Sequence, residues 1–449
     1  MSIEEYLDRL TAQLRCRKAR EPVREELRQH MEDQAAAFLA DGMEADQAQE
    51  AAVREMGDPV EVGNELDRIH RPKMAWKLIA LIGVLGIVGY LVQYFLRARF
   101  LGTAAEAAVS PGKELALLIL GFAVMTGVCF LDYSRFAKRP GLLSVALYGA
   151  LLAGKACFGT MVNGSEKWIS LGPVSVDLSL VLFLLVPLYA AVLYSWRGQG
   201  YGAVVKGALW MLPAVWLAFQ CPSMYASLVL FFSGLIVLIA AVAKGWFRVS
   251  KRKTLGVLIG TVVATPLLLG AMVFLRGGYQ AARITAMLDP EGSPSYQLMM
   301  IRNLLAGSKW VGSADVLSTE AAGVFAENCV GEYILTFVVS YYGILAGGVL
   351  VGLIVWLLIR LYRISVRQKN ELGQMMGIGC ASVLTLQVAL YLMENAGRVL
   401  MGVYCPFLTY GGSGILVDSC LFGLVLSVYR YENVLPVSRP PVRGTSRVW

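Results

Sequence analysis

The stretch Gly331-Glu332-Tyr333-Ile-Leu-Thr-Phe-Val-Val-Ser-Tyr-Tyr-Gly343 opens an apolar run that continues to Ile359. A run of this length exceeds the ~20 helical residues that cross a bilayer core. It predicts a transmembrane helix, because a backbone exposed to lipid must satisfy its own hydrogen bonds. Glu332 stands where this run meets a long polar stretch, which begins at Arg276. A carboxylate at the edge of a membrane segment is costly to bury, which favours a functional role.

The composition extends this interpretation to most of the chain. Of its 449 residues, 57% are hydrophobic and 16% are charged, whereas soluble domains average about 25% charged residues. The apolar runs are also much longer than the ~10-residue alternating strands of an outer-membrane barrel. We therefore predict an all-α, polytopic membrane protein of about ten transmembrane helices, with a small cytoplasmic helical N-terminal domain. The spans are expected near residues 75–95, 115–132, 142–161, 174–194, 203–220, 223–243, 255–275, 332–359, 372–394 and 410–429.

Positive charge is concentrated in alternate connections between the predicted spans. Basic residues gather in segments 135–139, 244–253 and 360–369, and the net charge of the chain is +8. Lysine and arginine accumulate in loops on the cytoplasmic side, so these segments and both termini are predicted to be cytoplasmic. The large loop 276–331 and Glu332 would then face outward. Topology and contact with anionic lipid headgroups explain the basic segments better than nucleic-acid binding does.

The first 72 residues differ from the rest because they are rich in charged residues and show helical periodicity instead of long apolar runs. We predict three parts: a cytoplasmic helical prefix domain (1–72), a transmembrane domain (73–432) with the large loop, and a basic cytoplasmic tail (433–449). The prefix resembles the short helical domains that precede some bacterial permease-like proteins. Its role is either docking or regulation, or support of assembly as a solvated helical bundle.

Capping signals set the expected helices of the prefix. One face of a first helix is marked by apolar residues at helical spacing: Ile3, Tyr6, Leu7, Leu10 and Leu14. Pro22 suits the first turn of a second helix, which Asp41-Gly42 would end. A third helix is expected from about Glu44 to Met56, and Asp58-Pro59 would open a fourth.

Three motifs appear in order along the membrane region. Trp168-Ile169-Ser-Leu171-Gly172 precedes the fourth span, and the large loop holds Arg283, then Leu288-Asp289-Pro290, then Ser295-Tyr296-Gln297. The segment Pro406-Phe407-Leu-Thr-Tyr-Gly-Gly-Ser413 starts the last span. With ten spans and a large loop after the seventh, this set resembles the SEDS family of bacterial cell-wall glycosyltransferases (FtsW, RodA and SpoVE). The resemblance covers nearly everything after residue 75.

The resemblance implies a reaction and a catalytic residue. Such enzymes polymerise lipid II on the outer face of the bacterial cytoplasmic membrane, in cell elongation, division or sporulation. An acceptor sugar hydroxyl attacks the anomeric carbon of a growing glycan and undecaprenyl pyrophosphate leaves, which requires a base and a group that stabilises the pyrophosphate. Glu332 stands eleven residues before Gly343, as an aspartate does before a glycine in the eighth span of the family. The resemblance therefore assigns Glu332 as the base.

Partners and a cofactor are also implied. Lipid II and membrane lipids are the expected ligands, a class B penicillin-binding protein (a transpeptidase) is the expected protein partner, and no nucleic acid is expected. A divalent cation, Mg²⁺ or Mn²⁺, is an expected requirement without assigned ligands. The eight cysteines show no metal-binding spacing, and the two histidines, His30 and His70, lie outside the membrane region.

The candidates for substrate binding are Lys167, Trp168, Arg283, Gln297, Lys309, Thr409, Tyr410, Gly411, Gly412 and Ser413. Lys167 would contact pyrophosphate or anchor the chain at the membrane interface beside Trp168. Arg283 and Lys309 would bind substrate phosphates or pair with acids of the loop.

The other candidates also have two interpretations. Gln297 would hydrogen-bond a sugar or pack within the loop. Residues 409–413 would form an anion pocket at a helix start, or a helix cap with a close-packed glycine pair. Glu394 and Arg398, four residues apart, are predicted to pair with each other. Asp177 and Asp418 lie in apolar runs, where a carboxylate is costly to bury, so each must find a partner or become protonated.

The sequence also departs from the family pattern. Glu332 is a glutamate where an aspartate is expected, and misplacement of a catalytic group by about 1 Å can cost roughly 100-fold in rate. A family glutamate after the Trp-Ile-x-Leu-Gly motif is lost in Asp177-Leu178-Ser179-Leu180. These departures leave two other functions open: a non-catalytic scaffold for a transpeptidase, and a transporter of lipid-linked precursors.

Overall fold

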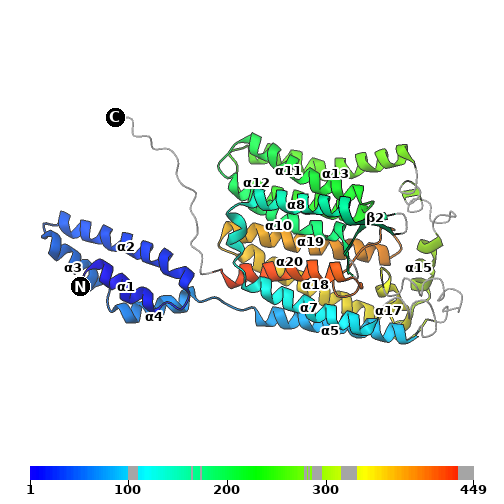
Figure 1. Ribbon diagram of the computed structural model, residues 1–449, viewed down its shortest axis with the longest axis horizontal. Helices are drawn as coiled ribbons and strands as arrows, with labels where there is room; N and C mark the ends of the chain where they lie inside the picture. Colours follow the sequence, from blue (N-terminus) through cyan, green and yellow to red (C-terminus); the bar gives the residue numbers. More distant parts are fainter. Residues whose placement is uncertain are drawn as a thin grey trace.

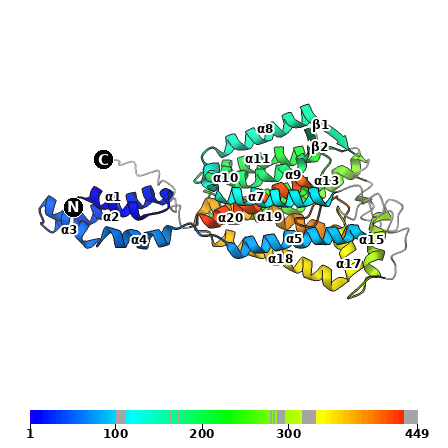
Figure 2. The same ribbon diagram turned by 60° about the horizontal axis from the view of Figure 1, so that its bottom comes forward.

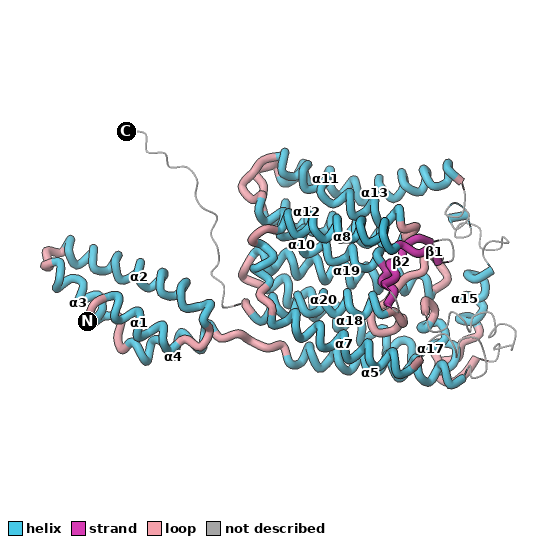
Figure 3. Tube along the Cα trace, in the orientation of Figure 1, coloured by secondary structure: helices cyan, strands magenta, loops and turns pink. Residues whose placement is uncertain are grey.

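The structure, a computed structural model, is a bundle of long helices with a group of four further helices at one end (Figures 1 and 2). It describes residues 1–99, 110–162, 165–171, 174–277, 281, 284–285, 296–314 and 331–432. We call the end of the bundle next to residues 1–72 the prefix end. The opposite end, where α15 (Tyr296–Ala306), α17 (Ile334–Tyr342) and the strands lie, is the far end (Figure 3).

The prefix consists of α1 (Ile3–Gln13), α2 (Arg17–Ala40), α3 (Ala45–Glu55) and α4 (Pro59–His70). Tyr6, Leu7, Leu10 and Leu14 are buried in its core, which confirms the predicted face of the first helix. Asp58 caps α4 as predicted, because its side chain accepts a hydrogen bond of 2.9 Å from the amide of Val60. The prediction for Pro22 is wrong: α2 begins at Arg17, so the proline lies inside the helix.

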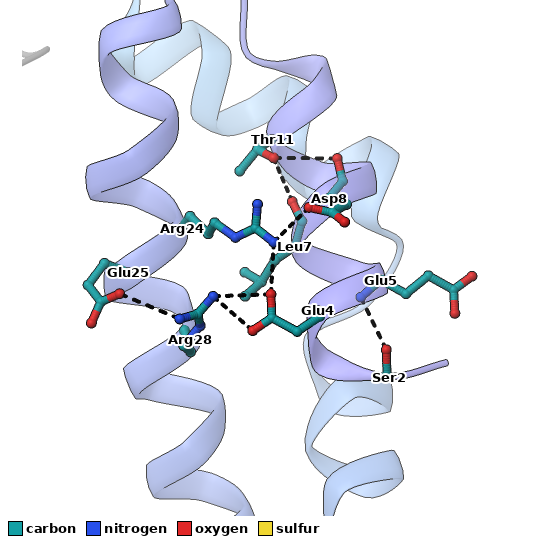
Figure 4. Close-up of polar contacts among 9 residues, drawn as sticks. All are labelled: Ser2, Glu4, Glu5, Leu7, Asp8, Thr11, Arg24, Glu25 and Arg28. Atoms are coloured by element: carbon teal, nitrogen blue, oxygen red, sulfur yellow. Dashed lines mark hydrogen bonds and ion pairs between the residues drawn. The ribbon is translucent and has the colours of Figure 1, made fainter.

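Ion pairs join the first two helices of the prefix across their exposed faces (Figure 4). Arg24 lies 2.8 Å from Glu4 and 2.7 Å from Asp8, and Arg28 lies 2.8 Å from Glu4. Pairs this exposed contribute little stability each, on the order of 0–1 kcal/mol. The buried apolar face therefore holds α1 against α2, and the ion pairs fix their register.

Nine helices in the described part of the chain are long and apolar enough to cross a membrane. They are α5 (Trp76–Arg99), α7 (Pro111–Phe130), α8 (Pro140–Phe158), the continuous segment Leu178–Ser195 that ends in α10 (Leu185–Ser195), α11 (Tyr201–Gln220), α12 (Met224–Lys244), α18 (Ile344–Arg367), α19 (Glu371–Asn395) and α20 (Gly412–Arg430). A further helix, α13 (Lys251–Arg276), coincides with the predicted seventh span. The chain is a multi-pass, predominantly α-helical membrane protein, as predicted.

The predicted eighth span, 332–359, is interrupted. The short α17 (Ile334–Tyr342) comes first, and α18 is the helix that crosses the membrane. Gly343 separates them with a φ of 100°, a conformation that side chains disfavour. A Cβ on Gly343 would also lie 2.6 Å from the carbonyl oxygen of Trp310. The prediction of one continuous helix is wrong because apolar periodicity does not reveal this break.

A small sheet lies at the far end and was not predicted. Strands β1 (Gly159–Val162), β2 (Ser165–Leu171) and β3 (Val174–Asp177) pair antiparallel in the order β1-β2-β3. The helix of the fourth span therefore starts four residues later than predicted. Residues 174–177 are strand, and α9 (Leu178–Val181) opens the helical segment. Asp177 caps α9, since its side chain accepts a hydrogen bond of 2.9 Å from the amide of Ser179.

The prefix contacts the bundle through the start of α2. The Lys18 ammonium lies 2.8 Å from the Asp132 carboxylate and 4.5 Å from the centre of the Tyr431 ring. The amide of Lys73 donates to the carbonyl of Arg430 at 3.2 Å. Burial raises the pKa of Asp132, but its hydrogen bonds, first that from Lys18, outweigh this and place the pKa below its usual value.

Candidate active site

Glu332 lies at the far end of the bundle, two residues before α17, and its side chain is partly buried. The first turn of α17 is attached to the end of α19 by one amide side chain. Asn395 donates to the Glu332 carbonyl at 2.9 Å and accepts from the amide of Thr336 at 3.0 Å. The N-cap residue of α17, Tyr333, makes no side-chain capping hydrogen bond. Asn395 of the neighbouring helix therefore supplies the acceptor that the first turn of α17 needs.

The Glu332 carboxylate lies against the backbone of Gly402. A Cβ on Gly402 would be 2.8 Å from Oε1 of Glu332, and the φ of Gly402 is 69°. Both the close approach and the left-handed backbone require glycine at this position. The connection between α19 and α20 therefore forms a wall against the Glu332 carboxylate.

A second carboxylate fixes that wall. Glu394 is fully buried, and its oxygens accept hydrogen bonds from the amides of Met401, Gly402 and Val403 at 2.8, 2.8 and 2.7 Å. Hydrogen bonds to a charged acceptor are short and strong. The predicted pairing of Glu394 with Arg398 is wrong: no ion pair joins them in the described chain, and Arg398 is exposed to solvent. The two carboxylates lie on either side of Gly402.

The rest of this connection is held between α5 and α20. Gln93 of α5 donates to the carbonyl of Leu408 at 2.6 Å. Phe407 has a φ of 69°, the one positive value among the described residues other than glycine. Gly89 of α5 leaves room for the carbonyl oxygen of Phe407, which would lie 1.9 Å from a Cβ at position 89. Residues in such strained conformations persist only where the surroundings determine them, which is common beside functional sites.

Lys167 lies on β2 and contacts Asp177 of β3, with 3.3 Å between the ammonium and the carboxylate. The ammonium also lies 5.4 Å from the centre of the Trp168 ring. The amide of Asp177 in turn donates to Ser413 Oγ at 2.8 Å. This chain of contacts ties the sheet to the first turn of α20. It gives Asp177 the partner that its burial requires.

Residues 409–413 form a structured helix start. Thr409 Oγ1 accepts from the amide of Cys405 at 3.0 Å, and Ser413 is occupied by Asp177. Gly411 precedes α20 without a side-chain cap, and Gly412 is its first residue. Neither contact caps α20, so the helix cap and the anion pocket both stay predictions, including any role of the partly buried Tyr410.

The loop candidates are spread along the far end. Gln297 lies on α15 (Tyr296–Ala306) and is partly buried, and Arg283 lies outside the described residues. The carbonyl of Lys309 accepts from the amide of Ile344, at the end of α17 opposite Glu332. The nine residues of α17 put about 14 Å between these positions. Lys309 is thus not brought next to Glu332.

Sequence patterns missed Asn395 and Arg302, which shape the site, and assigned the wrong partner to Glu394. Glu394 and Asn395 belong to an apolar helix, and their partners are distant in the sequence or lie beyond the helix end. The guanidinium of Arg302 on α15 donates to the carbonyl of Gly397 at 2.9 Å, which attaches α15 to the end of α19. The one available signal was the position of two polar residues, Glu394 and Asn395, at the end of an apolar run.

Asp418 presents a different case. It is buried in α20, and neither carboxyl oxygen has a hydrogen-bond partner among the described residues. It lines a cavity of about 420 Å³ between α5, α7 and α20, together with Gln93, Glu114 and Tyr404. The cavity contains no basic residue among its described lining, so it does not suit a pyrophosphate.

No group of three histidine, cysteine, aspartate or glutamate side chains forms a metal site within the described ranges. Mg²⁺ usually binds through one or two carboxylates, water and substrate phosphates. A substrate-completed site of that kind needs only one carboxylate from the protein, which Glu332 can supply by its chemistry. The divalent cation stays a prediction.

Fold and site together define a polytopic α-helical membrane protein. At one end of its bundle a carboxylate is enclosed by α17, the end of α19 and the connection to α20. Residues 73–434 match the FtsW, RodA and SpoVE family, described as "Cell cycle protein". The chain belongs to this family.

Relatives with similar sequences are named peptidoglycan glycosyltransferases. The chain is 26% identical to the "Peptidoglycan glycosyltransferase MrdB" of Escherichia coli K12, over 73% of this chain and 87% of that protein. It is 28% identical to a "Probable peptidoglycan glycosyltransferase FtsW" of Thioalkalivibrio sulfidiphilus, over 71% of this chain and 80% of that protein.

Solved structures share the fold. Rod shape determining protein RodA of Thermus thermophilus superposes with a TM-score of 0.55 at 20% identity, over 80% of this chain and 97% of that one. A chain described under "Structural coordination of polymerization and crosslinking by a peptidoglycan synthase complex" gives a TM-score of 0.62 at 24% identity, over 80% of this chain and 98% of that one.

Proposed function

We propose that this protein is a peptidoglycan glycosyltransferase that polymerises lipid II at the far end of its bundle, with Glu332 as the general base. The observation that carries the proposal is the position of the Glu332 carboxylate against Gly402, on a wall fixed by Glu394. Family membership supports the reaction class. The names of the relatives, all peptidoglycan glycosyltransferases, agree with it.

The proposed step is a displacement at the anomeric carbon. The acceptor hydroxyl oxygen forms the new glycosidic bond while the bond between that carbon and the pyrophosphate oxygen breaks. The hydroxyl proton passes to the Glu332 carboxylate, and undecaprenyl pyrophosphate leaves with the bonding electrons. A carboxylate within hydrogen-bond reach of the attacking hydroxyl can contribute about 10²–10⁴-fold to such a step.

The negative charge of the leaving pyrophosphate must be stabilised by cations. Lys167 and Lys309 are the described candidates, with Arg283 beyond the described residues. Lys167 already contacts Asp177, which offsets part of its positive charge but also holds its ammonium in place. A divalent cation would supply further positive charge at the pyrophosphate.

We also propose that the far end faces the outside of a bacterial cytoplasmic membrane, with both termini in the cytoplasm. The basic segments 135–139, 244–253 and 360–369 connect helices at the prefix end, and positive charge favours the cytoplasmic side. A class B penicillin-binding protein is the proposed partner. The match to a chain from a complex that coordinates polymerisation and crosslinking supports this choice.

The decisive experiment is a gel assay of glycan formation from lipid II by the purified protein with its transpeptidase partner. Wild type should form glycan with Mg²⁺ or Mn²⁺ and lose this activity with EDTA. Glu332→Gln should form none while being expressed and folded. Glu166→Gln is the matched control, because Glu166 is an exposed carboxylate on β2 at the same end.

Two results would reject the proposal. Wild type that forms no glycan, together with rescue of a deletion strain by Glu332→Gln, would identify a scaffold for the transpeptidase. Movement of lipid II across vesicles without any glycan product would identify a transporter.

A further inference from the structure

A groove of about 460 Å³ lies on the opposite half of the molecule from Glu332. α8 and α11 form its sides, and α10 and α12 form its floor. Val145 of α8 and Leu209 of α11 are 58% and 57% exposed at its rim, so the groove opens toward the lipid. Near the prefix end its sides meet, because Gly141 of α8 lies against the Trp210 ring of α11.

The interior of this groove suits a hydrocarbon chain. Its floor is formed by Val186 and Tyr189 of α10 and Leu230 of α12. The hydroxyl of Tyr189 donates to the carbonyl of Gly207 at 3.1 Å, so it presents its ring and not an unpaired polar group. Along α11 the lining extends from Lys206 to Ala214, a rise of about 12 Å.

The prefix end of the groove carries positive charge. Lys206 lines it, is exposed, and has no ion-pair partner within the described chain. Lys138 and Arg139, also exposed, immediately precede α8, which begins beside Trp210. No acidic residue belongs to the described lining. An anion at this end would meet Lys206 and no carboxylate of the described lining.

Aromatic side chains mark the same end as a membrane interface. The rings of Trp196 and Trp210 pack edge to face with their centres 5.8 Å apart. Tryptophan is enriched where the hydrocarbon meets the headgroups. The groove therefore places its cations at headgroup level and its apolar lining at the level of the chains.

We propose that the groove binds an anionic glycerophospholipid, with one acyl chain between α8 and α11 and its phosphate at Lys206. Charge selects the occupant: a zwitterionic lipid fits the apolar part equally well but gains less from the cations. The groove is separate from Glu332, which is not part of its lining and lies at the far end. Its assignment does not depend on the glycosyltransferase proposal.

Native mass spectrometry of the full-length protein with added phosphatidylglycerol or phosphatidylcholine tests this. Wild type should retain phosphatidylglycerol in preference to phosphatidylcholine of the same chain length. Lys206→Gln should weaken phosphatidylglycerol retention about fivefold, the effect of roughly one lysine near an anionic headgroup. Val145→Trp should fill the groove from its exposed rim and reduce retention of both lipids.

Lys253→Gln is the matched control, since Lys253 is an exposed lysine in the first turn of α13 at the same end and is absent from the groove lining. It should retain phosphatidylglycerol as wild type does. Equal retention of the two lipids by wild type would overturn the proposal, and so would equal losses in Lys206→Gln and Lys253→Gln. Capture of a partner's transmembrane helix by wild type but not by Val145→Trp, with no lipid bound, would also overturn it.

Discussion

Gly402→Ala should displace the Glu332 carboxylate without unfolding the protein. The new methyl group would begin 2.8 Å from Oε1 of Glu332, whereas carbon and oxygen normally approach to about 3.3 Å or more. Because Glu394 fixes the backbone of Met401, Gly402 and Val403, the side chain of Glu332 must give way. The required shift is roughly 0.5 Å.

This shift can be converted into an expected rate. A misplacement of about 1 Å costs on the order of 100-fold, so half of that predicts about a tenfold loss of glycan formation. The backbone contributes a separate effect: alanine at a φ of 69° costs about 1–2 kcal/mol of stability. Activity must therefore be measured per folded protein, with thermal unfolding in detergent recorded alongside.

Two controls separate position from strain. Gly198→Ala carries a similar φ, 78°, with nothing within 4 Å, so it should lose stability but keep full activity. In a Glu332→Asp background the side chain is about 1.5 Å shorter. Gly402→Ala should therefore add little to the loss of activity that the aspartate already causes. Activity of Gly402→Ala within twofold of wild type, or equal losses in both backgrounds, would refute the reasoning.

Two further predictions concern the framework. Lys18→Ala should release the prefix from the bundle, seen as faster protease cleavage near residues 71–75, whereas Arg17→Ala, beside it on α2, should not. The pKa of Asp132 is lowered in the folded protein, so the stability that its ion pair contributes is present above the unfolded pKa of about 3.9 and is lost as pH falls below it. Cleavage should therefore accelerate only in that acidic range. Acceleration near neutral pH would contradict the assignment. Gly343→Ala should lower the unfolding temperature more than Gly312→Ala, because both have positive φ but only Gly343 meets the Trp310 carbonyl; equal shifts would show that strain alone matters.

The positions of the membrane helices could be predicted because the signal is local. A run of apolar residues long enough to cross the bilayer folds as a helix, because lipid offers no hydrogen bonds to the backbone. The family motifs added the expectation of a large loop and the proposed role of Glu332. The break at Gly343 escaped prediction because the first amides of α18, those of Ile344 and Leu345, donate to the carbonyls of Lys309 and Trp310, which lie elsewhere in the sequence.

The same contrast applies at the site. The sequence by itself determined that a carboxylate stands at the edge of a membrane span and that Lys167 and Ser413 lie in recognisable motifs. Only the tertiary structure decided what surrounds that carboxylate: Gly402 against it and Asn395 holding its helix. The reason is physical. Helix formation depends on neighbours within a turn or two, whereas these contacts join residues more than sixty positions apart and exist only once α17 and α19 have packed.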